Sequence, residues 1–308
     1  MIKLAFISLI SMIFFTGDTS EIVMEKTITK TTTEIATDTS AIETLAEMPV
    51  ETSENEHEVT CSVKNDVYQV GEKLTYKVYY NWTAVWMSAG KAMFDIQEGN
   101  VGGKAALHIV SKGVTARSFD WFFKVRDRYE TYIDPETIQP LKFVRSVKEG
   151  DYTKENLFTF DHDNNEAMVH YRKRMGKLQA ENEKVTIPNC TQDLLSAIYY
   201  TRCIDYETMS EGDIIPVELF LDGEIYSVHL RYKGKDKLKH NRKWYNCVKF
   251  SPLLLEGDTF DGGEAMTIWA TDDDNRLPLL IESPLTVGSV KAYLIDYEGL
   301  KHDVTSLR

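Results

Sequence analysis

Alternation of apolar and polar residues is the dominant pattern along the chain, and it predicts β-strands over most of its length. Leu74, Tyr76, Val78 and Tyr80 alternate with more polar positions, and a two-residue period places one side of a strand against a core. The pattern recurs in about a dozen segments up to residue 295, separated by turn signals such as Asp222-Gly223. The sequence therefore predicts a meander of antiparallel hairpins.

One stretch departs from this alternation and predicts a helix. Leu194, Ala197, Ile198 and Thr201 follow helical spacing and form one face. Asn189 is the expected N-cap residue. Because further apolar side chains widen that face, the helix should be buried against the sheet. The predicted fold is mainly β, a strongly curved antiparallel sheet or barrel-like meander with one central buried helix at about residues 190–204.

The first sixty residues differ from the rest of the chain. Lys3 precedes an apolar run over 4–15, which predicts a signal peptide at 1–17, with an uncleaved membrane anchor as the alternative. Residues 18–60 hold eleven Thr, nine Glu and no aromatic residue, a composition that predicts a disordered spacer. Residues 61–308 are then expected to form a single β-rich domain. We expect a protein exported to the periplasm or outer cell envelope, without a transmembrane segment after cleavage.

Charge narrows the range of partners. The formal net charge is −13, of which residues 21–60 contribute −8, leaving −5 for the predicted domain. An acidic chain without an evident basic face predicts no nucleic-acid partner and no electrostatic docking on an anionic membrane. The chain has no G-x-G-x-x-G or P-loop motif and no regularly spaced metal ligands, so no cofactor is expected.

Cysteines and acidic residues leave several questions open. The four cysteines, Cys61, Cys190, Cys203 and Cys247, are either disulfide-bonded, as export permits, or free buried thiols. A bridge between Cys190 and Cys203 is disfavoured because a regular helix would separate them by about 20 Å. No hydrolase motif such as G-x-S-x-G occurs. The sequence therefore favours a protein without catalytic activity, although carboxylates assembled in space would escape this test.

Two groups of residues are candidates for ligand binding. The first is aromatic and predicted to lie in loops or at strand starts, where rings can stack on sugars or lipids: Trp82, Trp86, Trp121 and Phe122. The alternative is that these rings plug the ends of a curved sheet. The second group is ionic, with the helix residue Asp193 expected to meet an inward arginine or to leave that arginine for an anionic ligand: Arg126, Asp127, Arg145, Asp193 and Arg202.

Several short motifs, taken in order, resemble those of the DUF3108 family. They include Val70-Gly-Glu-Lys-Leu-Thr-Tyr76, Ala89-Gly-Lys-Ala92, Val125-Arg-Asp127, Asp193-Leu-Leu-Ser-Ala197 and Val287-Gly288. The resemblance runs from about Val67 to the C-terminus, and the ending from Gly288 to Leu300 is similar to a Bacteroides-like branch. It implies a β-rich, exported bacterial envelope protein of uncharacterised function.

Three functions follow as hypotheses. The favoured one is a non-enzymatic lipid- or glycan-binding or envelope-maintenance module that uses the concave face of the sheet or its aromatic rim. The second is an envelope polysaccharide hydrolase with spatially assembled carboxylates, one of which would have a raised pKa. The third is a structural partner in an envelope protein complex, tethered by the acidic spacer.

Overall fold

The computed structural model describes residues 63–308 except 83–84, 122, 255–265 and 285–287. The predicted signal peptide at 1–17 and spacer at 18–60 lie outside the described residues. Both stay predictions, as does the assignment of residues 61–308 to a single domain.

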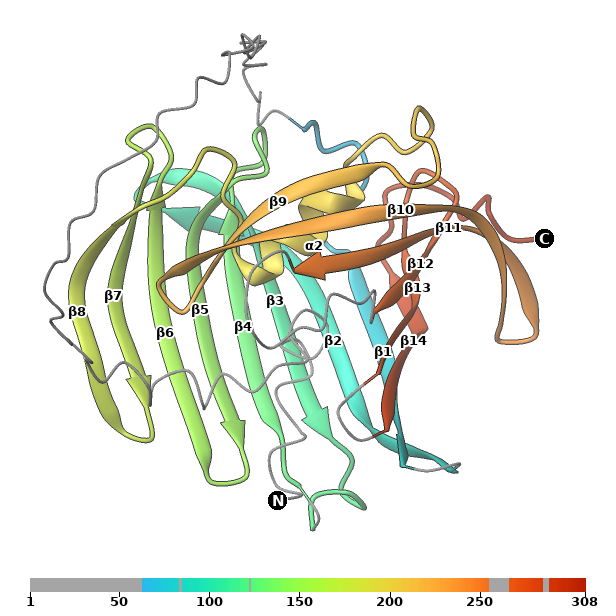
Figure 1. Ribbon diagram of the computed structural model, residues 1–308, viewed down its shortest axis with the longest axis horizontal. Helices are drawn as coiled ribbons and strands as arrows, with labels where there is room; N and C mark the ends of the chain where they lie inside the picture. Colours follow the sequence, from blue (N-terminus) through green and yellow to red (C-terminus); the bar gives the residue numbers. More distant parts are fainter. Residues whose placement is uncertain (1–62, 83–84, 122, 255–265, 285–287) are drawn as a thin grey trace, which may run out of the picture. The chain divides into compact units, whose positions relative to one another are not determined.

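Fourteen strands of the described chain form one antiparallel sheet (Figure 1). The first eight run from the start of the described chain to the helix: β1 (Lys73–Trp82), β2 (Val85–Val101), β3 (Lys104–Thr115), β4 (Arg126–Ile133), β5 (Pro140–Glu149), β6 (Tyr152–Asp161), β7 (Glu166–Arg174) and β8 (Lys177–Thr186). Six strands follow the helix: β9 (Ile214–Leu221), β10 (Glu224–His240), β11 (Lys243–Leu254), β12 (Thr267–Thr271), β13 (Pro278–Pro284) and β14 (Ser289–Glu298).

The strand order shows how the two halves of the chain meet. From edge to edge the sheet reads β8-β7-β6-β5-β4-β3-β2-β1-β14-β13-β12-β11-β10-β9. Every pair of neighbours is also consecutive in the chain except β1 and β14, which pair with Val78 opposite Ala292. The two edges, β8 and β9, are joined in sequence through the helix α2 (Leu194–Arg202). The predicted antiparallel β meander with one buried helix is therefore confirmed, and the sheet is open.

The sheet folds over so that one of its edges, strand β9, faces the strands in its middle. The β9–β10 hairpin passes across the face of β4, β5 and β6 (Figure 1). Its turn residue Asp222 bonds to Arg145 on β5 and Asn156 on β6. The segment before α2 pairs with β9, because the amide of Gln192 donates to the carbonyl of Glu218 at 2.8 Å. Helix α2 is thus enclosed between β4 and β9.

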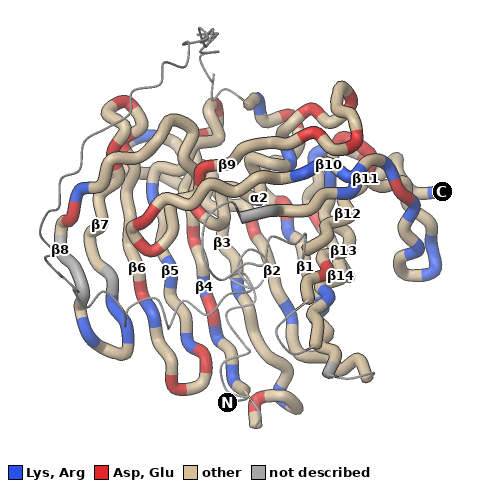
Figure 2. Tube along the Cα trace, viewed as in Figure 1, with Lys and Arg blue, Asp and Glu red and all other residues tan. Residues whose placement is uncertain are grey.

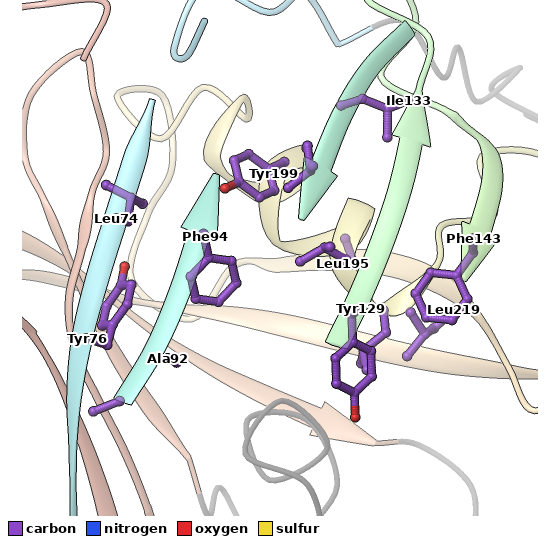
Figure 3. Close-up of a cluster of buried hydrophobic side chains, with 14 of the residues drawn as sticks. Leu74, Tyr76, Ala92, Phe94, Tyr129, Ile133, Phe143, Leu195, Tyr199 and Leu219 are labelled. Atoms are coloured by element: carbon purple, nitrogen blue, oxygen red, sulfur yellow. The ribbon is translucent and has the colours of Figure 1, made fainter. Parts of the chain in front are cut away.

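Apolar side chains from both layers fill the space around α2. Figure 3 shows Leu195 and Tyr199 of the helix among residues of β1, β2, β4 and β5. Ring contacts extend the core toward the crossing hairpin, with Phe158 and Phe220 edge to face at a centroid distance of 5.1 Å. Fully burying one such side chain contributes about 1.5–3 kcal/mol, so this layer contact stabilises the crossing.

The helix differs from its expected bounds. It begins at Leu194, with Asp193 rather than Asn189 as its cap, because the residues before it pair with β9 instead. Trp82 and Trp86, predicted to lie in loops or at strand starts, stand at the end of β1 and the start of β2. Strand β8 has ten residues and forms one edge of the sheet.

Two glycines in the family motifs occupy positions where a side chain would clash. A Cβ atom on Gly90 would lie 2.2 Å from the carbonyl oxygen of Val114 on the neighbouring strand. Gly288 has φ +83, and its Cβ would lie 1.9 Å from the carbonyl oxygen of Asn81. Backbones can approach this closely only where glycine is present, so both motif glycines serve the sheet.

Candidate functional site

The start of α2 is fixed to the sheet by one buried carboxylate. Asp193 accepts from the amides of Leu195 at 2.7 Å and Ser196 at 2.8 Å, and its own amide donates to the Ser196 hydroxyl. The Thr131 hydroxyl of β4 donates to the same carboxylate at 2.5 Å. Burial raises the pKa of Asp193 to about 6, against the opposing effect of these hydrogen bonds. Asp193 therefore meets a threonine and not the arginine that the sequence suggested.

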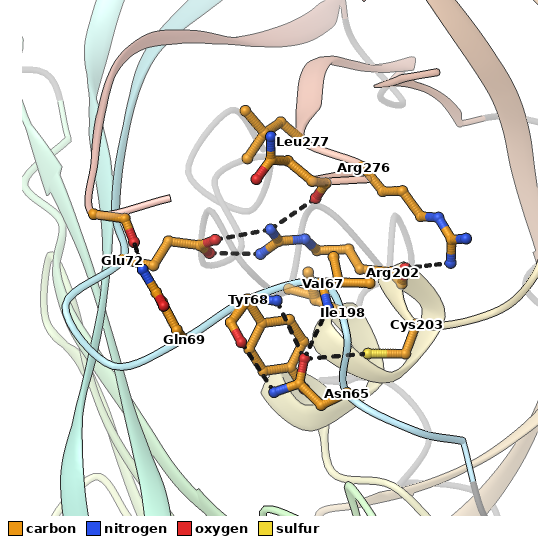
Figure 4. A network of polar contacts seen from close by, with 12 residues as sticks. Asn65, Val67, Tyr68, Gln69, Glu72, Ile198, Arg202, Cys203, Arg276 and Leu277 are labelled. Atoms are coloured by element: carbon orange, nitrogen blue, oxygen red, sulfur yellow. Dashed lines mark hydrogen bonds and ion pairs between the residues drawn. The ribbon is translucent and has the colours of Figure 1, made fainter. Parts of the chain in front are cut away.

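The end of α2 is held by a buried ion pair (Figure 4). Arg202 donates to both carboxylate oxygens of Glu72, at 2.6 and 2.9 Å, and to the carbonyl of Asn275 at 3.0 Å. The guanidinium lies 5.3 Å from the ring centroids of Tyr68 and Tyr199. A bidentate ion pair beside two aromatic rings has a well-defined orientation. Arg202 therefore positions the end of the helix, and Glu72 neutralises the charge of Arg202.

A second ionic cluster lies beneath the turn of the β9–β10 hairpin. Asp222 accepts from Arg145 at 3.2 Å, from Lys154 at 2.5 Å and from Asn156 at 2.8 Å. Burial outweighs the ion pair at Lys154 and lowers its pKa to about 8. The cations Arg145 and Lys154 act against the burial of Asp222 and bring its pKa to about 2. Arg145 thus anchors the crossing hairpin and is occupied by a carboxylate of the protein itself.

Two carboxyl groups meet at the end of β5. Burial, followed by the adjacent charge of Asp127, raises the pKa of Glu149 to about 9. Asp127 also accepts from the amide of Lys148 at 3.1 Å. Glycoside hydrolysis needs carboxyl groups about 5–10 Å apart on either side of the sugar bond. Both residues are buried, with 4% and 7% of their surfaces exposed, so this pair offers no open cleft to a sugar, and the hydrolase hypothesis stays a prediction.

The aromatic candidates do not gather into one site. Trp86, at the start of β2, is 39% exposed, and the Lys291 ammonium lies 4.9 Å from its ring centroid. Trp121 is 84% exposed and lies in the turn before β4. Phe122 lies outside the described residues, as does the side chain of Trp82. Arg126 likewise lies near this turn, where it pairs with Asp120 at 2.6 Å.

The interior also holds an apolar cavity beside α2. Its volume is about 80 Å³. It is lined by helix residues, including Ala197 and Ile198, and by side chains from eight strands, among them Leu74, Phe94, Leu230, Phe250, Ile281 and Ala292. An apolar lining of this kind favours hydrocarbon, because a sugar would leave its hydroxyl groups without hydrogen bonds.

One cation lines this cavity without a carboxylate partner in the described chain. Arg276 donates to the carbonyls of Arg202, at 3.1 Å, and Ile204, and its guanidinium lies 5.5 Å from the ring centroid of Tyr206. Arg276 and Tyr206 also line a neighbouring polar pocket of about 60 Å³. These two residues therefore mark the boundary between an apolar and a polar space.

The thiols divide into two kinds. Cys190 is disulfide-bonded, whereas Cys203 and Cys247 are free and buried. The disfavoured Cys190–Cys203 bridge is thus not formed, and the disulfide leaves Cys190 without a free thiol to act as a nucleophile. Among the described residues, no three His, Cys, Asp or Glu side chains gather as metal ligands.

Sequence reasoning missed the partners of the arginines and the cavity itself. Glu72 lies in a family motif and Arg202 was an ionic candidate, but nothing in the sequence connected the two residues. Asp222 occupied a recognised turn, which concealed its second role under the hairpin. Arg276 follows an Asp-rich turn, and nothing in the local pattern distinguishes it from a solvated arginine. The cavity depends on side chains from eight strands and has no local signal in the sequence.

A family model described as "Protein of unknown function (DUF3108)" matches residues 75–295. No curated protein matches the chain. Among solved structures, a Brucella abortus protein described as β-barrel-like, with a domain of unknown function DUF1849, is 11% identical. The alignment covers 77% of this chain and 100% of that chain, with a TM-score of 0.52. This likeness shows a β-barrel-like fold alone.

Two other solved structures are more distant. A Bacteroides fragilis protein assigned as exported, with a YmcC-like fold, is 10% identical over 75% of this chain and 97% of that chain, with a TM-score of 0.29. The Mycobacterium tuberculosis lipoprotein LppX is 11% identical over 76% of this chain and 88% of its own, with a TM-score of 0.15. Within the described part of the chain, no helix combines the length and apolarity that a membrane crossing requires.

Proposed function

Since the chain belongs to the DUF3108 family, whose members are described as proteins of unknown function, we propose a function from its own interior: non-enzymatic binding of a lipid acyl chain beside α2, in an exported envelope protein. The observation that carries the proposal is the apolar cavity between the helix and the folded-over sheet. The predicted signal peptide and spacer belong to the same proposal, since they place the domain where envelope lipids occur.

The size of the cavity limits what it accepts. A water molecule needs roughly 10–15 Å³ of such space, and an apolar cavity of about 150 Å³ holds benzene. The cavity of about 80 Å³ therefore suits the end of one hydrocarbon chain and excludes a complete lipid. The rest of the ligand must then lie at the boundary marked by Tyr206 and Arg276.

Arg276 gives the ligand a preferred polarity. Arg276 lines the cavity, and its guanidinium has no ion-pair partner within the described chain. A carboxylate or phosphate beside it would form charge-assisted hydrogen bonds. The proposed ligand is therefore an anionic amphiphile whose hydrocarbon end enters the cavity.

Titration calorimetry with straight-chain carboxylates of increasing length tests this proposal. Each methylene that enters the cavity contributes about 0.8 kcal/mol, so the affinity should rise about fourfold per carbon and then reach a plateau. Affinity that does not depend on chain length would contradict the proposal. Native mass spectrometry of protein purified from its own cell envelope would identify the bound class directly.

Two variants with matched chemistry locate the binding. Ala197→Leu places a larger side chain from α2 into the cavity and should weaken carboxylate binding at least tenfold, while thermal unfolding shows that the fold is kept. Ala105→Leu, at an exposed position, is the control and should bind like the wild type. Equal binding by both variants would place the ligand elsewhere.

A further inference from the structure

Basic residues are concentrated in one hairpin of an otherwise acidic protein. Residues 231–243 hold seven Lys or Arg and a single acidic residue, Asp236, although the whole chain has a net charge of −13. Figure 2 shows blue positions, which mark Lys and Arg, along β10 and β11 and toward the turn that joins them. The net charge of the whole chain therefore gives no indication of this basic surface.

The hairpin extends beyond its neighbours in the sheet. Strand β9 pairs with β10 only over residues 224–231, and β12 pairs with β11 only over 247–250. Beyond these paired ranges, residues 237–240 of β10 pair with residues 243–246 of β11. The C-terminal segment runs along the outer edge of β11 here, because the amides of Asn246 and Arg308 donate to the carbonyls of Ser306 and Trp244, both at 2.9 Å. The end of the hairpin is therefore a ribbon of β10 and β11, flanked on one edge by residues 306–308, and it displays its side chains on two faces.

One face of the ribbon packs on the protein. His240 is buried, stacks on Tyr293 of β14 at a centroid distance of 5.7 Å and forms a hydrogen bond with the carbonyl of Leu294 at 2.5 Å. Leu238 and Tyr245 are partners in register on the same face. Because side chains alternate along a strand, the residues between them point away from the protein.

The other face is basic and carries a tryptophan. Lys237 pairs in register with Asn246, and Lys239 with Trp244. Trp244 is 49% exposed, and the Lys239 ammonium lies 5.9 Å from its ring centroid. Arg242 and Lys243 at the turn are also exposed.

Four of these charges have no ion-pair partner among the described residues. They are Lys237, Lys239, Arg242 and Lys243. Other bases nearby are neutralised, since Lys235 pairs with Asp272 at 2.9 Å and Lys249 with Asp236 at 3.5 Å. Like charges held close together repel one another, and an anionic surface would remove that repulsion.

We propose that this ribbon end is a docking surface for a membrane rich in anionic phospholipid. Each Lys or Arg close to such a surface contributes about 1 kcal/mol, and an exposed indole prefers the boundary between headgroups and hydrocarbon. A nucleic acid fits less well, because a single tryptophan is no platform for stacking successive bases. This docking does not depend on a ligand in the cavity, and it reverses for one surface the expectation drawn from net charge.

Co-sedimentation of the full chain with vesicles tests the proposal. The protein should bind phosphatidylcholine vesicles that contain phosphatidylglycerol, should bind pure phosphatidylcholine vesicles far less, and should dissociate at high salt. Equal binding to both vesicle types would overturn the proposal. Binding to DNA without binding to the anionic vesicles would overturn it as well.

Two variants that remove the same total charge assign the surface. The hairpin variant should bind the anionic vesicles on the order of a thousandfold more weakly: K237Q/K239Q/R242Q/K243Q. The control removes four exposed lysines from other strands and turns and should bind like the wild type apart from a small general loss: K104Q/K112Q/K148Q/K177Q. Equal losses in the two variants, with unchanged thermal unfolding, would mean that net charge and not this ribbon is responsible.

Discussion

Two regions of the interior, the ionic cluster around Asp222 and the apolar cavity beside α2, are packed in different ways. Beneath the β9–β10 turn, the space is filled by charged groups that hold one another at fixed distances: Arg145, Lys154 and Asp222. In the second region, aliphatic and aromatic side chains from eight strands leave a cavity of about 80 Å³. Buried charges need their partners in one geometry, whereas apolar contacts have no preferred direction. The charged side is therefore suited to fixing the fold, and the apolar side to admitting a ligand.

The largest effect should come from removing the central carboxylate of the charged side. Asp222→Asn leaves Arg145 and Lys154, both nearly buried, without their shared counter-ion. Breaking a buried pair in this way costs about 3–5 kcal/mol, which urea unfolding would measure. Asp272→Asn is the matched control, because its partner Lys235 is 63% exposed and an exposed pair contributes less than about 1 kcal/mol. Similar losses in both variants would show that the hairpin turn does not rely on its charges.

A second effect should appear as a dependence of stability on pH. The pKa of Glu149 is about 9 in the folded protein, above that of an unfolded glutamate, so folding takes up a proton between about pH 5 and 8. The stabilisation is complete below the unfolded pKa and is lost as pH rises through the folded one, with a slope approaching about 1.4 kcal/mol per pH unit. The raised pKa of Asp193, about 6, adds a slope of the same sign only below pH 6.

Glu149→Gln should flatten this slope, because an amide cannot ionise. Unfolding free energies measured across the pH window would show the change. Glu155→Gln, at a position with 42% side-chain exposure, should keep the slope of the wild type. A wild-type slope that persists in the Glu149 variant would assign the proton uptake to other groups.

The smallest effect should come from the cavity side. Ala292 lines the cavity, so Ala292→Val adds carbon atoms where space exists and should change the unfolding free energy by less than about 1 kcal/mol. Ala167 is equally a buried strand alanine, fully enclosed on β7, and Ala167→Val should cost about 1–3 kcal/mol through overpacking. Equal costs at the two positions would mean that the cavity is not available space.

The strands and the helix were predictable from the local pattern, because burial of one face of an element places apolar residues at regular intervals in the sequence. Turn residues such as Asp222-Gly223 marked the hairpins in the same local way. The order of the sheet was not predictable, because the pairing of Val78 with Ala292 joins residues far apart in the chain. The same limit concealed the candidate site: Glu72, Arg202 and Arg276 come from distant segments, and their contacts are set by the folding-over of the sheet.

Pairing between β1 and β14 also has a consequence for the order in which the chain can fold. Strands β1 to β8 form a continuous meander with only neighbouring contacts, so they can assemble while the rest of the chain is still being made or exported. During that interval β1 presents an unpaired edge, and such edges recruit strands from other molecules. A chain that stops before β14 would therefore keep the edge of β1 unpaired and open to aggregation. Only a chain that includes the last strand covers this edge.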